Sequence, residues 1–258
     1  MWIKTIIKKI IFRSKADSAT YINHLRSIGM TVGDRVTIYE PTSVCIDETR
    51  PFLVNIGNDV KITRGITILT HGYDWSVLAG MHDVVLGSAG GVTIGNNVFL
   101  GMNTTILKGV HIGNNVIIGA DSLVNKDVPD NCVAAGNPCK YIMSIDEYYN
   151  KRKGQQLAEA FEIYEKYVEK FGTEPKQEIF DEFFFLFHRR EDELPPAFER
   201  QMKWHDRFAE TLNELKHSQP MFDGYDRFLQ AAREYREKNR TQGSLKEGST
   251  DEEARRPG

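Results

Sequence analysis

A period of six residues governs the middle of this chain and limits the folds open to it. Between residues 94 and 129, an aliphatic side chain recurs at every sixth position, and a glycine follows four of them. The aliphatic set is Ile94, Leu100, Ile106, Ile112, Ile118 and Val124. An α-helix would place apolar residues three and four apart, and an isolated strand would alternate by two. The pattern therefore predicts a parallel β-helix with one short strand per hexad.

The same six-residue grid extends toward the N-terminus, with a single break at Arg50 beside Pro51. It includes Val32, Ile38, Val44, Ile56, Ile62 and Ile68. Three hexads make one triangular coil, so coils are expected over 32–49 and 50–67, then a third opened by a loop, then 94–111 and 112–129. We therefore predict a β-helix domain of about five coils over residues 31–145.

The grid fails between Leu69 and Val92, because Ile68 and Ile94 are 26 residues apart, which is not a multiple of six. This segment is predicted to be a loop pushed out of the coil. Irregular loops on a rigid scaffold commonly carry catalytic residues, and His71 lies where the coil opens. A neutral imidazole, with an ordinary pKa of about 6.5, can accept a proton from a hydroxyl. His71 is the candidate general base; the alternative is a surface histidine that caps a turn.

Composition excludes some functions. The net charge of −3 and pI near 6.2 give no basic surface, so nucleic acid is not an expected partner. Three cysteines without a C-x-x-C spacing argue against a disulfide framework and a zinc site. We therefore expect no metal and a reducing, cytoplasmic location.

The flanking segments read as helical. Residues 1–30 contain two short amphipathic helices, at 1–14 and 17–29. Lysines interrupt the apolar run of the first, which is too short to span a bilayer; it either lies on the inner membrane surface or packs on protein. Residues 146–238 show helical spacing of aromatic residues, read as a core or else as a docking surface for polymer or partner. The polar tail 239–258 is expected to be disordered.

Several motifs together resemble the hexapeptide-repeat acyltransferases, which have a left-handed parallel β-helix. The resemblance covers about residues 30–145 and is nearest to the enzymes that O-acetylate bacterial surface polysaccharides and to the maltose and galactoside acetyltransferase group. It rests on IGNNVF (94–99), IGNNVIIGA (112–120), VNKDVP (124–129), AAGNPCK (134–140) and LTHGYDW (69–75). It implies a homotrimer, acetyl-CoA as co-substrate, and direct acetyl transfer to a sugar hydroxyl without an acyl-enzyme.

The resemblance also implies the residues that bind the coenzyme. They are Gly101, Met102, Gly119, Ala120, Asn125, Lys126 and Lys140. Lys126 and Lys140 suit the coenzyme's phosphates, although a solvated surface lysine is the alternative for each. Met102 stands where relatives often have a small polar residue, which weakens that contact.

Acceptor binding is assigned to Asp74, Trp75 and His82 in the loop, since an aromatic face and a carboxylate can bind a sugar ring. Asp74 or Asp83 could instead orient His71 or only solubilise the loop. Three other functions remain open. They are an N-acyltransferase for an amino-sugar nucleotide, a catalytically silent scaffold, and a γ-type carbonic anhydrase, although the spacing of His71, His82 and His111 does not suit its zinc ligands.

Overall fold

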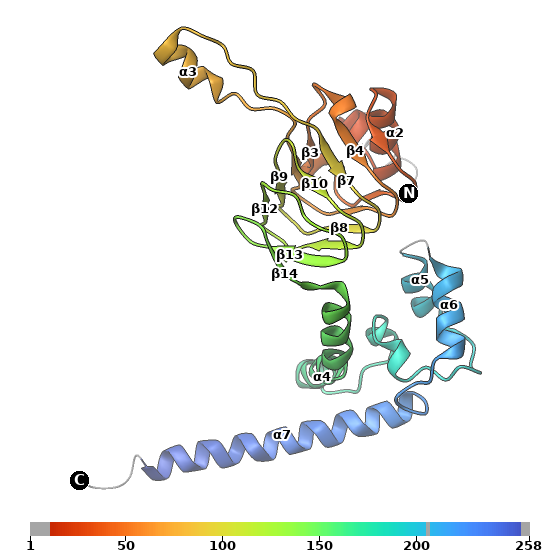
Figure 1. Ribbon diagram of the computed structural model, residues 1–258. Coiled ribbons are helices and arrows are strands. Elements are labelled where there is room, and N and C mark those ends of the chain that lie inside the picture. The colour runs from red at the N-terminus through yellow and green to blue at the C-terminus, as the bar shows by residue number, and fades with distance from the viewer. Residues whose placement is uncertain (1–10, 205–206, 254–258) are drawn as a thin grey trace. The chain divides into compact units, whose positions relative to one another are not determined.

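The computed structural model describes residues 11–204 and 207–253, with side chains as far as residue 239. The chain divides into two compact units, Met1–Asn150 and Lys151–Gly258. The first unit contains the coiled strands, and the second is helical (Figure 1).

Three parallel sheets wrap the first unit into a three-sided coil. Sheet A contains β1 (Thr31–Val32), β4 (Val54–Ile56), β7 (Val92–Ile94) and β10 (His111–Ile112). Sheet B contains β2 (Thr37–Ile38), β5 (Lys61–Ile62), β8 (Val98–Leu100), β11 (Val116–Ile118), β13 (Cys132–Ala135) and β14 (Lys140–Ser144). Sheet C contains β3 (Cys45–Ile46), β6 (Thr67–Ile68), β9 (Thr105–Ile106) and β12 (Leu123–Val124). As far as β12, each strand pairs with the strand three places along the chain, so one coil contributes one strand to each sheet.

Four coils are complete, and a fifth is partial. The fifth has a parallel bridge between Val128 and Ile112 and the strand β13. β14 then runs antiparallel to β13 and ends sheet B. The predicted parallel β-helix with one short strand per hexad is confirmed.

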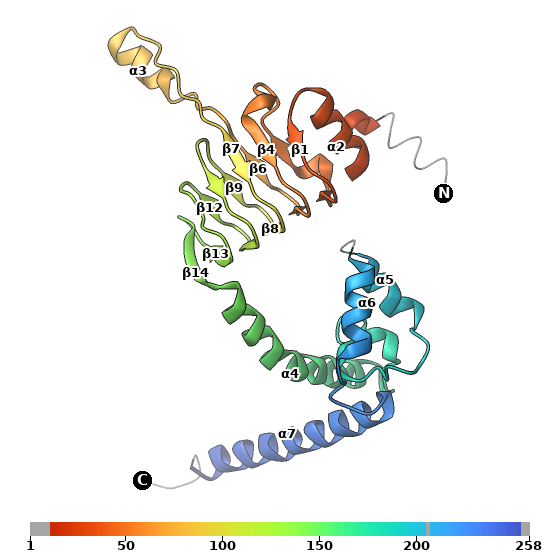
Figure 2. The ribbon, with the colours of Figure 1, turned by 45° about the vertical axis from the view of Figure 1, so that its right-hand side comes forward.

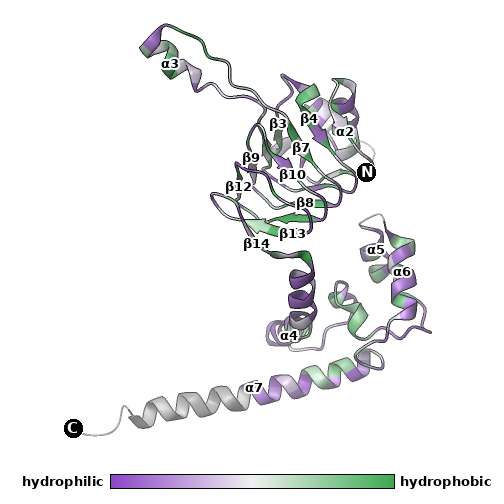
Figure 3. Ribbon diagram, in the orientation of Figure 1, coloured by the Kyte–Doolittle hydropathy of each residue, from purple (hydrophilic) through white to green (hydrophobic). Residues whose placement is uncertain are grey.

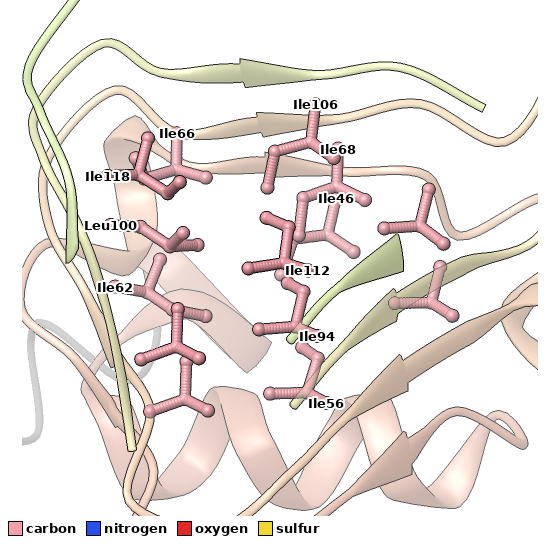
Figure 4. Close-up of a cluster of buried hydrophobic side chains, with 14 of the residues drawn as sticks. Ile46, Ile56, Ile62, Ile66, Ile68, Ile94, Leu100, Ile106, Ile112 and Ile118 are labelled. Carbon is pink, nitrogen blue, oxygen red and sulfur yellow. The ribbon is translucent and has the colours of Figure 1, made fainter. Parts of the chain in front are cut away.

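The hexad side chains form three inward rows, one behind each sheet (Figure 4). Ile56, Ile94 and Ile112 stack in one row, Ile62, Leu100 and Ile118 in the second, and Ile46, Ile68 and Ile106 in the third; none is more than 4% exposed. Burial of each such side chain stabilises the fold by about 1.5–3 kcal/mol. The rows give adjacent coils a fixed register.

The register of the first coil differs from the prediction. A 3-10 turn, η2 (Pro41–Ser43), adds two residues, so Ile46 rather than Val44 occupies the row of Ile68. Val44 is buried as well, because side chains alternate with a period of two and a shift of two keeps the same face inward. A second turn, η3 (Pro51–Leu53), precedes β4.

The expected third coil opened by a loop is absent as a separate coil from the described chain. β6 completes the second coil, β7 begins the next, and residues 69–91 leave from the corner between sheets C and A. This segment contains an unpredicted helix, α3 (Trp75–His82), which has no buried residue. Both ribbon views show α3 extending away from the coils (Figures 1 and 2).

The N-terminal segment covers the first coil. After η1 (Arg13–Lys15), α2 (Ser18–Ser27) begins at the cap Asp17, whose carboxylate accepts a hydrogen bond from the Thr20 amide at 2.8 Å. Tyr21 and Leu25 of α2 are fully buried in the same core as the hexads. The predicted helix over 17–29 is confirmed, whereas the predicted helix over 1–14 lies largely outside the described residues.

The second unit is built mainly of helices. They are α4 (Ile145–Phe171), η4 (Gln177–Phe180), η5 (Phe184–Leu186), α5 (Pro196–Lys203), α6 (Phe208–His217) and α7 (Tyr225–Glu253). The hydropathy colouring shows polar residues along most of α4 and apolar residues in strands such as β8 and β13 (Figure 3). Phe180, Phe187, Phe198 and Phe228 are buried, so the aromatic stripe forms a core.

α7 continues to Glu253, where disorder was expected from residue 239. Its sequence is rich in Arg, Glu, Lys and Gln, which have good helix propensity. Low hydrophobicity therefore did not prevent a helix in this segment.

Candidate active site

A buried carboxylate, Asp47, is the centre of the most connected polar group in the β-helix. Only 8% of this residue is exposed. Its Oδ1 accepts hydrogen bonds from the Thr49 amide at 3.0 Å and the Thr49 hydroxyl at 2.7 Å. Its Oδ2 accepts from the Thr70 amide at 3.2 Å and from the Thr70 hydroxyl. The same oxygen lies 2.5 Å from Nδ1 of His71.

The register of sheet C creates this contact. β3 pairs with β6 so that Ile46 faces Ile68, and the Asp47 amide donates to the Ile68 carbonyl at 3.0 Å. Asp47 therefore lies directly beside the point where the second coil ends and the loop begins. The backbone of two hydrogen-bonded coils, and not the loop, sets the separation of Asp47 and His71.

The hydrogen bonds determine the charge of Asp47. Burial by itself raises the pKa of this carboxyl group, but the hydrogen bonds from Thr49, Thr70 and His71 outweigh it and hold the pKa well below its ordinary value. Asp47 is therefore ionised at neutral pH, and its carboxylate can always accept a hydrogen bond from Nδ1 of the adjacent imidazole.

His71 is oriented with one nitrogen toward protein and the other unused. Its side chain is 14% exposed. When Nδ1 donates its proton to Asp47, the neutral imidazole has an unprotonated Nε2, and Nε2 has no hydrogen-bond partner within the described ranges. This is the tautomer required of a base that accepts a proton at Nε2.

Residues of the loop surround His71 on one side. The legs of the loop are held together by hydrogen bonds from the Gly72 amide to the Ser88 carbonyl at 3.0 Å and from the Gly90 amide to the Thr70 carbonyl at 2.9 Å. The ring of Tyr73 lies edge-on to the His71 ring at 5.0 Å. These contacts fix where the loop starts, while α3 beyond them remains exposed.

The predicted acceptor residues are distributed along this loop. Trp75 begins α3, and its ring lies 6.2 Å from that of Tyr73. A Cβ on Gly72 would lie 2.4 Å from the Asp74 carboxylate, so Asp74 folds back over Gly72. His82, at the far end of the eight-residue helix, is separated from Trp75 by about 10 Å of helix. The ring of Tyr73 thus lies between those of His71 and Trp75, whereas His82 lies at the opposite end of α3 from Trp75.

The predicted coenzyme residues lie on two different edges of the coil. Asn125 and Lys126 follow β12, on the edge where His71 follows β6. β9 separates these two strands, so the residues lie about two strand spacings, or 10 Å, apart along that edge. Lys126 is exposed and, in the described part of the chain, has no ion-pair partner.

The other edge follows sheet B. Gly101 and Met102 follow β8, and Gly119 and Ala120 follow β11. The backbones are in close contact there, since a Cβ on Gly101 would lie 2.5 Å from the Ala120 amide nitrogen. Lys140 begins β14 and is exposed. One chain therefore does not gather all the predicted coenzyme residues into one groove.

Sequence reasoning missed Asp47, Thr70 and Tyr73. It considered Asp74 or Asp83 as the residue that orients His71, whereas the carboxylate in contact with His71 is Asp47. Asp83 instead ends α3 with a left-handed backbone conformation. Correct pairing of Ile46 with Ile68 would have identified Asp47, but the two residues added at η2 concealed that register.

The described residues contain neither a metal-binding cluster nor a helix that could cross a membrane. No group of three or more histidine, cysteine or acidic side chains is arranged to hold a metal ion in those residues. None of the helices described there is both long and apolar enough to cross a membrane.

Comparison with known proteins identifies the repeat. Residues 91–126 match the family model described as bacterial transferase hexapeptide (six repeats). The chain is 38% identical to Protein CapG of Staphylococcus aureus over 150 residues. These residues make up 58% of this chain and 83% of that protein. It is 42% identical over 112 residues to the polysialic acid O-acetyltransferase of Escherichia coli O1:K1 / APEC, covering 43% of this chain and 35% of that enzyme.

Among solved structures, a hexapeptide-repeat containing acetyltransferase of Vibrio cholerae matches with a TM-score of 0.43 and 22% identity, over 55% of this chain and 89% of that one. The chain therefore spans most of CapG but only about a third of the polysialic acid enzyme.

Proposed function

The chain belongs to the bacterial hexapeptide-repeat transferase family, and we propose that it moves an acetyl group from acetyl-CoA to a sugar hydroxyl with His71 as general base. The observation that carries the proposal is the Asp47–His71 pair, with Nδ1 of His71 held by a buried carboxylate and Nε2 left open. The resemblance to a polysialic acid O-acetyltransferase supports a surface polysaccharide or its precursor as the acceptor.

The chain's own residues act on the proton. His71 Nε2 accepts the proton of the acceptor hydroxyl as its oxygen attacks, and Asp47 stabilises the resulting imidazolium. When bound, acetyl-CoA supplies the thioester whose C–S bond breaks as the C–O bond of the ester forms. His71 then returns the proton to the departing sulfur, so no group on the chain is acylated.

The arrangement of charges suits the coenzyme's phosphates. Lys126 is on the same edge as His71, and Lys140 lies at the end of the stack; both are exposed and unpaired with any acidic side chain in the described residues. A flexible ammonium group is a suitable partner for a phosphate at such positions. The distance of about 10 Å along the edge leaves space for an extended arm between phosphates and thioester.

The distribution of the predicted coenzyme residues over two edges supports a homotrimer, in which one copy's edge faces a different edge of its neighbour.

The loop also has an exposed apolar surface, which we call the arm. Its exposed apolar residues are Val77, Met81, Val84, Val85 and Leu86, each at least 43% exposed. A group of exposed apolar residues of this kind is typical of a protein interface. We assign the arm to the contact between copies.

The acceptor would enter beside Tyr73 and Trp75. The ring of Tyr73 lies next to His71 and the ring of Trp75 lies next to that of Tyr73, and both offer apolar faces on which a sugar ring can stack. The Asp74 carboxylate, beside them, can accept hydrogen bonds from sugar hydroxyls. A sugar in this position would present a hydroxyl toward the imidazole.

The decisive experiment measures release of free coenzyme thiol from acetyl-CoA with defined acceptors. His71→Ala should lower the rate by about 100- to 10,000-fold, while the control His111→Ala, at the exposed first position of β10, should leave it unchanged. Unchanged turnover in His71→Ala would eliminate the mechanism. Paired hydroxyl and amino acceptors separate O-acetylation from the alternative, N-acylation of an amino sugar.

A further inference from the structure

The second unit contains a buried histidine that the proposed reaction does not use. His188 follows η5 and is 6% exposed. Neither ring nitrogen has a hydrogen-bond partner among the described residues, yet neither is a fully enclosed, unsatisfied atom. The ring packs edge-on against Phe198 at 5.9 Å. A buried imidazole with unused polar atoms costs free energy unless those atoms meet solvent or a ligand.

His188 lines a cavity of about 180 Å³ between η4, η5 and the start of α7. Its polar wall includes Gln177, Asp223 and Asp226, and its aromatic wall includes Phe187 and Tyr225. Sites for drug-sized ligands usually measure about 300–1,000 Å³, so this cavity suits a single small ring.

The polar wall is available for binding. The side chains of Gln177 and Asp223 have no hydrogen-bond partner in the residues that the structure describes, whereas Asp192 is already paired with Arg189 at 2.9 Å. Asp226 lies in the first turn of α7, where a carboxylate is favourable without any ligand. His188 points to a ligand most directly because it is buried, while the half-buried Gln177 and the exposed Asp223 lie at the rim with free polar groups.

The chemistry of the wall selects the ligand. Three aspartates against one arginine give a net charge of −2, which disfavours phosphates, carboxylates and nucleotides. An amide, an imidazole and carboxylates offer both donors and acceptors, and the half-buried ring of Tyr225 offers an apolar face, while Phe187 lies in the core behind it. Hydroxyl groups on a neutral ring use both the donors and the acceptors of this wall, whereas a cation would use only the carboxylates.

We propose that this cavity is a second carbohydrate site, which binds one neutral sugar residue through Gln177, His188 and Asp223. The proposal rests on the proposed function in one respect, since the sugar would belong to an oligomeric acceptor. In that role the site raises affinity for long acceptors without taking part in acetyl transfer.

Binding can be tested apart from catalysis, in the full-length His71→Ala protein without acetyl-CoA. Calorimetry and saturation-transfer NMR would use lactose, maltotriose and chitotriose as neutral probes, with a galacturonic acid trimer and a glucosamine trimer as charged ones. At least one neutral probe should bind, and Asp223→Asn or His188→Gln, added separately, should each weaken it at least tenfold. Glu162→Gln, on the exposed face of α4, should not change it.

Four results would overturn the proposal. They are no binding of neutral probes, binding of charged probes only, binding unaffected by both variants, and binding lost in His188→Gln but retained in Asp223→Asn. The last would place the ligand in the neighbouring cavity of about 300 Å³, which His188 lines together with Phe208 and Leu212. Circular dichroism shows whether each variant is folded. If His188→Gln does not fold, the surface variant Asp223→Asn still tests the proposal. Failure of transfer by the native chain would refute the proposed function and leave this binding intact.

Discussion

Replacement of Asp47 by asparagine is the sharpest test of how the candidate active site works. The substitution keeps the shape of the side chain but exchanges one carboxylate oxygen for an NH2 donor. The five donor groups around Asp47 belong to Thr49, Thr70 and His71, and each now donates to an oxygen. An amide cannot accept on both sides, so one side must rearrange.

The magnitude follows from these contacts. If the NH2 group faces His71, Nδ1 must become the acceptor, and the proton moves to Nε2, where the base is needed. The reaction then loses its general base, so kcat/KM should fall by about 100- to 10,000-fold, the usual contribution of such a group. At least one buried donor also loses its acceptor, at a cost of about 1–3 kcal/mol. Since domains are stable by about 5–15 kcal/mol, Asp47→Asn should remain folded.

Three measurements are required on the same proteins. Coenzyme thiol release gives kcat/KM, urea unfolding gives the free energy of unfolding, and ¹⁵N NMR of the imidazole reports which nitrogen carries the proton. The matched control, Thr49→Val, removes one hydrogen bond to Oδ1 and leaves Oδ2 with His71. It should lose about 1 kcal/mol of stability but little activity. An Asp47→Asn enzyme with near-native kcat/KM, or with the native tautomer and a large loss of activity, would refute the reasoning.

Other consequences are open to direct measurement. Because the pKa of Asp47 is lower in the folded chain than its unfolded value of about 3.9, its stabilising contribution is complete at neutral pH and is lost as pH falls below about 4. Urea unfolding at pH 7 and pH 3 should therefore show a larger loss for the native chain than for Asp47→Asn. Lys126→Ala and Lys140→Ala should each raise KM for acetyl-CoA about two- to fivefold, the size expected for an exposed ion pair, with kcat nearly unchanged. Val85→Asp on the arm should shift the native oligomer toward monomer in sedimentation, whereas Glu162→Gln should not.

The hexads predicted the fold because they encode its repeating contact directly. Ile62, Leu100 and Ile118 occupy one row because each ends a strand that pairs with the next coil. A six-residue period is incompatible with other regular structures, so a single sequence, read without an alignment, is sufficient to predict the fold. The turns at Pro41 and Pro51 were harder to place, because each inserts residues at a corner while the inward face is retained.

The candidate site was only half predictable. His71 was found because it interrupts the repeat, and position alone identified it. Asp47 was missed because its role depends on which residue of the first coil pairs with Ile68. An error of two residues in that register pairs Val44 with Ile68 and puts Cys45 in the place of Asp47. Tyr73 depends on the path of the loop after Gly72, which no periodic pattern encodes.

The anchoring of His71 separates the part of the chain that holds the imidazole from the part of the loop that is exposed. Asp47 comes from the preceding coil, and the hydrogen bonds between Gly72 and Ser88 and between Gly90 and Thr70 close the loop before α3 begins. No residue of α3 is buried, and the imidazole's hydrogen bond and ring contact are made with Asp47 and Tyr73, which lie outside α3. Under the proposed function, changes in the arm would alter the acceptor or the contact between copies, while the coils hold Nδ1 of His71 beside Asp47. The rigid repeat would then keep one proton-transfer geometry while the loop presents a variable surface.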